Sequence, residues 1–487
     1  MGETILDVLA RDVATRGGHP FIVHEDRRVT YAELDRRSSG AAAALAALGV
    51  EQGERVTLAL GNSAEYLIAA FGILKAGGVL NPVNPALGAA ELDYIVGHAE
   101  PRVVVTDAAH LGAFRRLRHP CTVVPPGALA TARGETPAAA VGPDHPALLL
   151  YTSGTTGNPK GVLFTHGNSG QGGRHFLGTL GVTADDTVLA VTPLFHGNAW
   201  GAVQTALHAG GTVAFPTAFH ASAFWPLVRE TGATVLYTLG TILAMLLARP
   251  PSEAERTSRL RVVLGLGSAP IRERVIERFG VRDVAECYGS TDAGVVTITP
   301  VGAPPRAGSC GPPVPGVEIR ILDDDGRALP PRAAGQIAVR SPSRMTGYFR
   351  DPAETALALR DDWFLTGDLG WLDEDGWLHF VDRKKDVIRR GGENVSSVLV
   401  EKVLREHPRV AEVAVVGVPD PVLGQEIKAF VVTSGPVGED ELGEFAAARL
   451  ARFQVPRVWE FRASLPKTAT GRVEKYKLRQ AGGALLG

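Results

Sequence analysis

The sequence predicts an α/β protein: a large N-terminal domain of two parallel-type αβ sheets plus a small β-rich unit, followed by a small α+β domain. Two observations predict the large domain. Helical patterns alternate with short β-branched runs over residues 5–117 and again over residues 147–299. A third observation separates the rest: after Pro300 the chain changes to Gly- and Pro-rich turns with short strands, and a compact α+β pattern follows residue 382.

The first alternating set combines the helical pattern Tyr31–Leu48 with the strand candidates Arg55–Leu60 and Arg102–Thr106. Such alternation is typical of a parallel sheet covered by helices on both faces. The Ala-, Gly- and Pro-rich stretch Pro125–Pro146 is predicted to be a surface connection. The second set supplies four strand candidates, which are Thr187–Val191, Thr212–Phe215, Thr234–Tyr237 and Arg261–Leu264.

The β-rich unit is expected to contain strands at Val317–Leu322 and Gly335–Arg340. A charged, glycine-containing segment, Asp382–Asn394, comes next. We expect the domain boundary there, with residues 1–382 forming the N-terminal domain and residues 383–487 the C-terminal domain.

Composition excludes several classes of function. The 487 residues carry 50 basic and 52 acidic side chains, so no global field attracts nucleic acid or an anionic membrane. Hydrophobic content of 45% argues against disorder. Three cysteines far apart, Cys121, Cys287 and Cys310, favour a reducing compartment. With no secretory or membrane-spanning pattern, we expect a cytoplasmic protein.

Residues Leu148–Val162 join an apolar strand to a run of Gly, Ser and Thr that ends at Lys160. Small residues let backbone N–H groups approach phosphate oxygens, hydroxyls donate hydrogen bonds, and the lysine adds positive charge. The pattern therefore predicts a polyphosphate site. It is not a Walker A loop, because Pro159 stands five residues after Gly154, where that motif needs Gly-Lys. For such a short run alone, an ordinary polar hairpin is the alternative.

The full string TSGTTGNPKG resembles the signature of the adenylate-forming superfamily, which includes acyl-CoA synthetases, aryl-CoA ligases, luciferases and nonribosomal adenylation domains. The resemblance runs from YAEL near Tyr31 to LPKTATGR near Arg472, with the motifs in the family's order. It implies an N-terminal domain that binds ATP and the acid, and a mobile C-terminal lid domain with its hinge near Lys385.

The resemblance also implies the nucleotide site. GLGSAP lies along the adenine, ECYGSTDAG stacks near adenine and reaches the α-phosphate, and TGDLG contacts the ribose. As a dinucleotide fingerprint GLGSAP is weak, since it lacks the third glycine, and an aspartate in TGD is equally typical of a turn. The implied ATP-binding residues are Thr152, Ser153, Gly154, Thr155, Thr156, Gly157, Lys160, Gly267, Ser268, Ala269, Pro270, Glu286, Cys287, Tyr288, Gly289, Ser290, Thr291, Asp368 and Arg383.

The implied catalytic residues are Lys160, His196, Thr291, Asp292 and Arg472, and Mg²⁺ is assigned to Thr155 and Asp292. The family usually has Glu at position 292, so the shorter side chain is expected to bind the ion through water or to shift it. Arg472 replaces the family's lysine, an exchange that changes a point charge into a planar fork. Two explanations stay open: compositional drift, since only 9 of the 50 basic residues are Lys, or adenylation retuned for an unusual substrate.

The acid and the thiol have their own implied positions. The acyl pocket is assigned to His196, Asn198, Trp200, Tyr237, Gly240 and Gly265, and the thiol channel to Gly391 and Gly392. A packed loop histidine is the alternative for His196. Trp200 and Tyr237 favour a small or aromatic acid over a long fatty chain. The family's usual proline near Gly240 is missing.

The function implied is ATP-dependent activation of a carboxylic acid to acyl-AMP, followed by transfer to a thiol, with ATP, Mg²⁺ and coenzyme A or another phosphopantetheine thiol as cofactors. Other acceptors or acids stay open: a carrier-protein thiol, an amine, or nitrite for N–N bond formation. A catalytically impaired nucleotide-binding homologue is the alternative from another class. The basic run Arg383–Arg390 is not predicted to bind nucleic acid, because it lacks interleaved aromatic residues.

Overall fold

The computed structural model describes residues 3–130, 140–152, 159–304, 306–384, 386–390, 393–420, 423–467, 471 and 473–482. Its chain divides into two compact units: residues 1–152, 158–318 and 339–364 form the first, and residues 153–157, 319–338 and 365–487 the second. The boundary predicted at residues 382/383 falls within the second unit and stays a prediction. In the part of the chain that the model describes, no helix is both long and apolar enough to span a bilayer.

One seven-stranded sheet of the first unit carries the phosphate-loop segment. Its order is β18-β8-β7-β4-β3-β5-β6, with parallel pairing from β7 to β6 and antiparallel pairing of β7 with β8 and of β8 with β18. The predicted strands near Arg55 and Arg102 are confirmed. The strands are β3 (Arg55–Ala59), β4 (Val79–Pro82), β5 (Val103–Thr106), β6 (Thr122–Val124), β7 (Pro146–Thr152), β8 (Lys160–Thr165) and β18 (Gly347–Tyr348).

The other seven-stranded sheet has the order β13-β12-β11-β9-β10-β1-β2 and is parallel except for β1 with β2. All four strands predicted in the second alternating set are confirmed as β9–β12. The sequence analysis treats residues 5–117 as one set, whereas β1, which lies in that range, pairs with β10 in this second sheet. The strands are β1 (Pro20–His24), β2 (Arg27–Thr30), β9 (Thr187–Ala190), β10 (Thr212–Ala214), β11 (Val235–Leu239), β12 (Val262–Leu266) and β13 (Asp283–Ala285).

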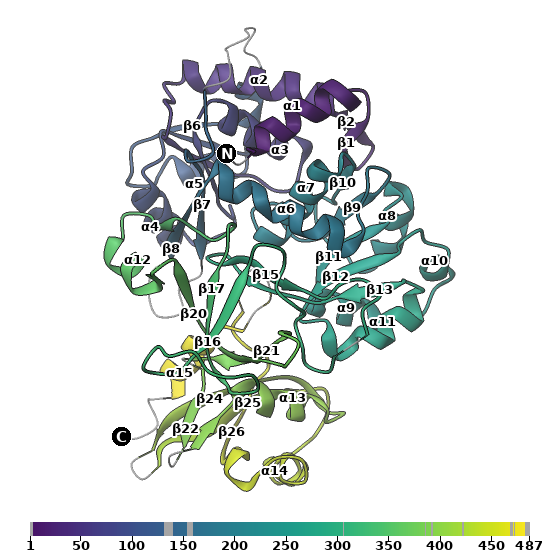
Figure 1. Cartoon of the computed structure of the whole chain (residues 1–487), viewed down its shortest axis with the longest axis vertical. Helices are drawn as coiled ribbons and strands as arrows, with labels where there is room; N and C mark the ends of the chain where they lie inside the picture. The colour runs from purple at the N-terminus through teal and green to yellow at the C-terminus, as the bar shows by residue number, and fades with distance from the viewer. Residues whose placement is uncertain are drawn as a thin grey trace. The chain divides into compact units, whose positions relative to one another are not determined.

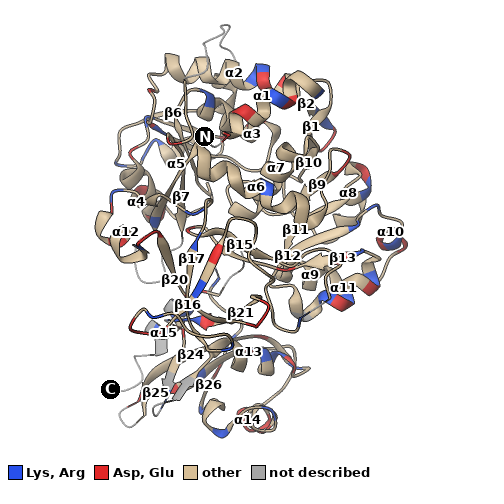
Figure 2. Cartoon of the chain, viewed as in Figure 1, with Lys and Arg blue, Asp and Glu red and all other residues tan. Residues whose placement is uncertain are grey.

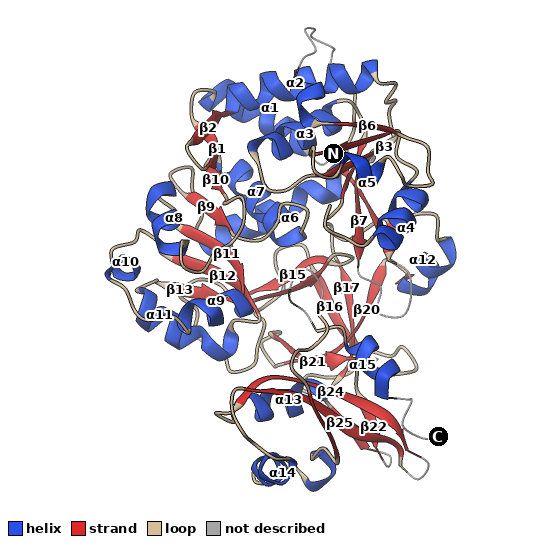
Figure 3. Ribbon diagram, turned by 180° about the vertical axis from the view of Figure 1, so that it is seen from behind, coloured by secondary structure: helices blue, strands red, loops and turns tan. Residues whose placement is uncertain are grey.

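Helices cover both faces of these sheets. In Figures 1 and 3, α6 (His166–Leu180) and α7 (Gly197–Ala209) lie between β7 and the strands β9–β12. The predicted helix at Tyr31 is confirmed as α2, which begins after Thr30, whose side chain accepts from the Glu33 N–H. The other helices of this unit are α1 (Ile5–Arg16), α2 (Tyr31–Ala47), α3 (Ala64–Lys75), α4 (Ala89–Ala99), α5 (Leu111–Phe114), α8 (Phe224–Thr231), α9 (Gly240–Leu247), α10 (Glu253–Arg256), α11 (Arg272–Phe279), α12 (Pro352–Ala358), η1 (Pro126–Leu129) and η2 (Ala269–Ile271).

Short strands begin at residue 287, earlier than the start after Pro300 that the sequence predicts for the β-rich unit, and the strands predicted near Val317 and Gly335 are confirmed as β16 and β17. A hairpin forms from β14 (Cys287–Ser290) and β15 (Gly294–Ile298). A five-stranded sheet then runs β16-β17-β20-β19, with β21 paired to β20. Its strands are β16 (Glu318–Leu322), β17 (Gly335–Arg340), β19 (Leu359–Arg360), β20 (Trp363–Leu372) and β21 (Leu378–Arg383).

The C-terminal part of the second unit is an α+β sheet structure, as predicted. Its sheet has the order β23-β22-β25-β24, with β26 parallel to β25, and its own core of buried aliphatic residues. The elements are β22 (Ile388–Arg390), β23 (Glu393–Val395), β24 (Val410–Asp420), β25 (Gly424–Thr433), β26 (Val458–Phe461), α13 (Ser397–Arg405), α14 (Glu439–Ala447), α15 (Lys475–Gly482) and η3 (Arg452–Gln454).

Charged side chains of both signs are interspersed along the elements. Figure 2 shows Lys and Arg next to Asp and Glu on helices such as α11, whose sequence is RERVIERF. This distribution agrees with the balanced composition and with the expectation that no global field forms.

Candidate active site

The predicted phosphate loop connects two paired antiparallel strands. Thr152 ends β7, Lys160 begins β8, and the two residues are partners in the register of the hairpin. The ends of the loop are therefore held side by side by the sheet. The predicted ATP-binding residues Ser153, Gly154, Thr155, Thr156 and Gly157 lie outside the described residues.

Lys160 has an anionic and an aromatic neighbour. Its ammonium forms an ion pair with Glu354 from α12, and its Nζ lies 5.0 Å from the centre of the Tyr348 ring. The Lys160 side chain is 35% exposed. An ammonium over a tyrosine face is attracted by the ring's quadrupole. The loop's lysine is thus directed by two residues that lie almost 200 positions later in the chain.

Tyr348 also contacts Asp292, the predicted metal ligand. The Tyr348 hydroxyl is hydrogen-bonded to the Asp292 side chain, and the Met345 N–H donates to the Asp292 carbonyl oxygen at 2.8 Å. Burial raises the pKa of Tyr348 above its ordinary value of 10.0, and the nearby Asp292 charge raises it further. The phenol is therefore neutral, and its O–H donates a hydrogen bond to the carboxylate. Lys160 and Asp292 thus contact the same tyrosine, the lysine at its ring and the aspartate at its hydroxyl.

The glycine-containing turn after β12 is held by a buried carboxylate. Glu286 accepts from the N–H groups of Gly267, Ser268 and Ala269 at 2.6, 2.7 and 2.8 Å, and from the Ser268 hydroxyl at 3.0 Å. Burial raises the pKa of Glu286 above its usual 4.5, although these four bonds oppose the shift. Because the three amides are occupied, they offer no donor to a phosphate, which disfavours the dinucleotide alternative.

Two glycines predicted for the acyl pocket pack against this turn. A Cβ on Gly240 would lie 2.2 Å from the Gly267 carbonyl oxygen, and one on Gly265 would lie 2.7 Å from the Ser268 Cβ. Gly267 itself has φ +75°, a conformation that favours glycine. The small residues therefore permit close approach of α9, β12 and the turn. The side chain of Pro270 is outside the described part of the chain.

The hairpin β14–β15 carries the remaining nucleotide-binding candidates, Cys287, Tyr288, Gly289, Ser290 and Thr291. Cys287 is paired with Ile298 and Tyr288 with Thr297. Burial raises the pKa of the Cys287 thiol well above its ordinary value, so it stays protonated at neutral pH. The turn is closed by a hydrogen bond of 3.1 Å from the Ala293 N–H to the Ser290 hydroxyl.

Three acyl-pocket candidates, His196, Asn198 and Trp200, lie at the start of α7, and the fourth, Tyr237, lies on β11. Burial lowers the pKa of His196 to about 4, and its Nε2 has no hydrogen-bond partner among the described residues. Asn198 accepts from the Thr192 hydroxyl at 3.0 Å. The Tyr237 hydroxyl is hydrogen-bonded to that of Thr205 at 2.8 Å, and its side chain is buried. These four side chains are uncharged at neutral pH.

In the second unit, the structure brings Asp368 and Arg383 together. They are partners in the β20–β21 register, and Arg383 Nε lies 3.5 Å from Asp368 Oδ1. Asp368 is only 7% exposed and lies within a strand, not in the turn that was the alternative. Lys385, Gly391, Gly392 and Arg472 are outside the described residues.

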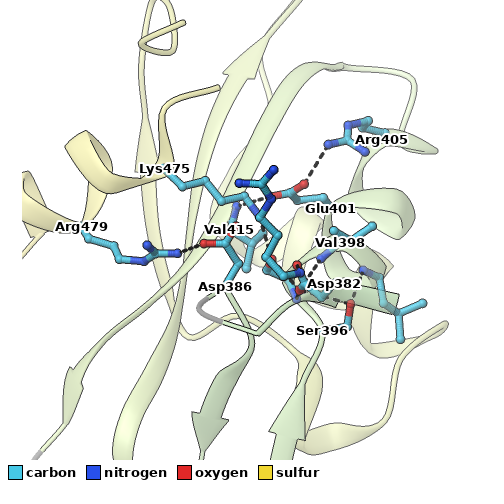
Figure 4. A network of polar contacts seen from close by, with 12 residues as sticks. Asp382, Asp386, Ser396, Val398, Glu401, Arg405, Val415, Lys475 and Arg479 are labelled. Atoms are coloured by element: carbon cyan, nitrogen blue, oxygen red, sulfur yellow. Dashed lines mark hydrogen bonds and ion pairs between the residues drawn. The ribbon is translucent and has the colours of Figure 1, made fainter. Parts of the chain in front are cut away.

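A buried polar network organises the residues around these positions (Figure 4). Asp382 accepts from the N–H and the hydroxyl of Ser397 at 2.7 and 2.8 Å. Lys475 donates to the Ser397 hydroxyl at 2.6 Å and lies 2.7 Å from Glu401 Oε1. Arg479 forms an ion pair with Asp386. Helix α15 is thus tied directly to Asp386 and to α13, and through Ser397 to Asp382.

The groups present fit Mg²⁺ held mainly by phosphates. Among the described residues, no group of three or more His, Cys, Asp or Glu could hold a metal ion by itself. Mg²⁺ at nucleotide sites is commonly bound by one or two carboxylates plus substrate phosphates, and Asp292 supplies one carboxylate near Lys160.

Sequence reasoning missed Tyr348, Glu354 and Lys475. Nothing in the local pattern GYFRDPAET distinguishes a tyrosine and a glutamate at a phosphate site from ordinary strand and helix residues. Their proximity to Lys160 depends on the pairing of β18 with β8, which joins distant parts of the chain.

Comparisons with known proteins agree with these motifs. The family model described as AMP-binding enzyme matches residues 9–349, and that of the AMP-binding enzyme C-terminal domain matches residues 399–472. A feruloyl-CoA synthase of Amycolatopsis sp. is 37% identical over 473 residues, with 94% of this chain and 95% of the relative covered. A sulfoacetate–CoA ligase of Cupriavidus necator is 35% identical, with 97% and 98% covered.

Solved structures lead to the same family. The ATP-bound MatB of Rhodopseudomonas palustris has a TM-score of 0.92 at 30% identity, with 100% of both chains covered. The o-succinylbenzoate CoA synthetase of Bacillus subtilis in complex with its acyl-adenylate intermediate has a TM-score of 0.90 at 29% identity, with 98% of both chains covered. The chain therefore belongs to the AMP-binding enzyme family, whose N-terminal and C-terminal models it both matches.

Proposed function

We propose that the protein is an ATP-dependent acyl-CoA synthetase that activates a small carboxylic acid as its acyl-adenylate. The observation that carries the proposal is that Lys160 and Asp292 both contact Tyr348, in a chain that matches CoA ligases along nearly its full length. A cation and a metal-binding carboxylate at one place suit phosphoryl chemistry, where catalysis is mainly positioning and charge neutralisation.

The first half-reaction forms a bond between a carboxylate oxygen and the α-phosphorus of ATP and breaks the bond to pyrophosphate. Lys160 and the amides and hydroxyls of Ser153–Gly157 would bind the phosphates, and Thr291 the α-phosphate. Mg²⁺, held by Asp292 and Thr155, would neutralise charge on the departing pyrophosphate. Arg472 would bridge the carboxylate and the α-phosphate, and Asp368 with Arg383 would bind the ribose.

In the second half-reaction, the thiol sulfur bonds to the acyl carbon, the thiol loses its proton, and AMP leaves with the electrons of the broken C–O bond. We assign the hinge to Lys385 and the thiol channel to Gly391 and Gly392. A glycine there lets a pantetheine chain pass close to the backbone.

The acid is proposed to carry no second charge. His196, Asn198, Trp200 and Tyr237 are uncharged, and the low pKa of His196 keeps its imidazole neutral. A pocket lined by neutral side chains offers no partner to an additional ion and penalises its desolvation. The similarity to a feruloyl-CoA synthase supports an aromatic acid. A cytoplasmic location is proposed from the three free cysteines.

A carrier-protein thiol is the second candidate acceptor. It is favoured by the 36% identity, over 490 residues, to a fatty acid–[acyl-carrier-protein] ligase of Streptomyces coeruleorubidus.

A panel of acids tests the function. Each acid is incubated with ATP, Mg²⁺ and either coenzyme A or a phosphopantetheinylated carrier protein, and products are identified by mass spectrometry. We expect acid-dependent pyrophosphate release and an acyl-CoA. Acyl-carrier protein alone would select the second candidate, whereas ATP binding without pyrophosphate release for any acid would refute catalysis.

Separate half-reactions test Arg472. Arg472→Ala is expected to slow formation of the adenylate more than thiol transfer from a supplied acyl-adenylate, because its charge is needed where the phosphate reacts. Equal losses in the two half-reactions would contradict this role.

A further inference from the structure

The segment Met345–Thr355 is fixed to the strand that begins at Lys160. The Thr346 N–H donates to the Leu163 carbonyl oxygen at 2.9 Å, and the Phe349 N–H to that of Gly161 at 2.7 Å. Between them, Tyr348 is the register partner of Val162. The backbone of Tyr348 is therefore set at a defined distance from the start of β8.

The same segment is closed on itself on the side away from β8. The Tyr348 N–H donates to the Thr355 hydroxyl at 2.8 Å, and that hydroxyl donates to the Asp351 carbonyl oxygen at 2.8 Å. Asp351 in turn caps α12 by accepting from the Glu354 N–H at 3.0 Å. These bonds leave the tyrosine few alternative backbone positions.

The two ends of the Tyr348 side chain meet two different functional groups. The ring face lies 5.0 Å from the Lys160 ammonium, and the hydroxyl is hydrogen-bonded to Asp292. Glu354 also binds the Lys160 ammonium, and as an anion it competes with ATP phosphates for it. The ring does not compete, because its face attracts the cation without occupying the ammonium's N–H donors.

We propose that Tyr348 is a positioning residue that sets the separation between the phosphate-binding Lys160 and the metal-binding Asp292, using its ring for the first and its hydroxyl for the second. The inference rests on the proposed function, since it takes both roles from there. An outer hydrogen bond to a metal-binding carboxylate orients that ligand.

Two substitutions separate the two contacts. Tyr348→Phe keeps the ring and removes the hydroxyl, whereas Tyr348→Leu removes both. Tyr31→Phe is the matched control, because the buried Tyr31 hydroxyl donates to the Gly211 carbonyl oxygen at 2.8 Å, outside the site. ATP binding is measured by calorimetry in the absence of the carboxylic acid substrate. The affinity is determined first in EDTA, without metal, and then over a series of Mg²⁺ concentrations. Circular dichroism and thermal melting verify that each variant is folded.

We expect Tyr348→Phe to bind metal-free ATP like the wild type but to need about tenfold more Mg²⁺ for half of the metal-dependent gain in affinity. Tyr348→Leu should show the same metal defect and bind metal-free ATP about three- to fivefold more weakly, as loss of a cation–π contact implies. Tyr31→Phe should match the wild type in both measurements.

Other outcomes overturn the inference in defined ways. An unchanged Mg²⁺ requirement in folded Tyr348→Phe refutes the role of the hydroxyl, and equal metal-free affinity of the Phe and Leu variants refutes the role of the ring. A wild-type protein that binds no Mg²⁺·ATP refutes the proposed function and the inference together. Wild-type binding with unaltered variants refutes the inference alone.

Discussion

Replacing Glu286 with glutamine tests whether a buried carboxylate holds the turn after β12. Its Oε1 accepts from Gly267 N–H, and its Oε2 accepts from two N–H groups and one hydroxyl at Ser268 and Ala269. Glutamine has one carbonyl oxygen, so its amide group must face at least one N–H donor. That buried donor loses its acceptor, which costs about 1–3 kcal/mol.

The remaining hydrogen bonds become neutral, at a further loss of about 1 kcal/mol each, and the relief of a buried charge offsets part of this. The expected net decrease in the free energy of unfolding is about 2–4 kcal/mol. Because the turn is assigned to adenine, ATP should also bind about tenfold more weakly.

Urea unfolding followed by circular dichroism gives the first quantity and calorimetry the second. Glu277→Gln, which changes an exposed carboxylate on the neighbouring helix α11, is the matched control and should stay within about 0.5 kcal/mol of the wild type. Wild-type stability and ATP affinity in Glu286→Gln would refute the reasoning.

Three further predictions concern packing, a buried ion pair and pH. Lys475→Met should lower the free energy of unfolding by about 1–3 kcal/mol in chemical denaturation, because the buried Glu401 loses one of its two cations and keeps only Arg405. The exposed Lys477→Met should change it by less than about 0.5 kcal/mol, and equal effects would contradict this reasoning. Gly240→Ala should weaken ATP binding, measured by calorimetry, and lower the stability measured by thermal melting, since its Cβ would lie 2.2 Å from a carbonyl oxygen. The control Gly178→Ala, at a helical position with open space around it, should leave ATP binding unchanged and be neutral or stabilising. Burial lowers the pKa of His166 from 6.5 to about 4. Its contribution to the free energy of unfolding is therefore fully present above pH 6.5 and is lost as the pH falls to 4, by about 1.4 kcal/mol per pH unit. Denaturation curves of His166→Asn should lack this part of the pH dependence, and an unchanged slope would exclude His166 as its source.

Local patterns predicted several strands of the two large sheets, but not how those strands pair. The strands β9 to β12 follow from β-branched runs between turn residues, and α2 from the helical pattern after its cap at Thr30. The pairing of β1 with β10 joins Ile22 to Val213. Such a parallel contact depends on which buried faces meet in three dimensions, and no spacing along the chain encodes it.

The residues of the candidate site, too, were predictable only in part. Lys160 ends a run of Gly, Ser and Thr whose residue types suit phosphates, whereas Asp292 is proposed only because ECYGSTDAG resembles a family motif. Tyr348 and Glu354 act through contacts with those strings from a later segment, and their own neighbours give no chemical signal. Asp368 and Arg383 were each proposed separately, but only the β20–β21 register reveals that they are paired.

The link between Lys475 and α13 has a consequence for biosynthesis. Lys475 lies 78 residues after its partner Ser397, and ribosomes add about 5–20 residues per second, so helix α13 emerges about 4–16 s before the lysine does. During that interval the acidic side chain of Glu401 lacks its ammonium partner, and the second unit cannot reach its final packing. Nascent chains halted before residue 475 should therefore be cleaved by proteases more readily in this unit than chains halted after α15 has left the exit tunnel.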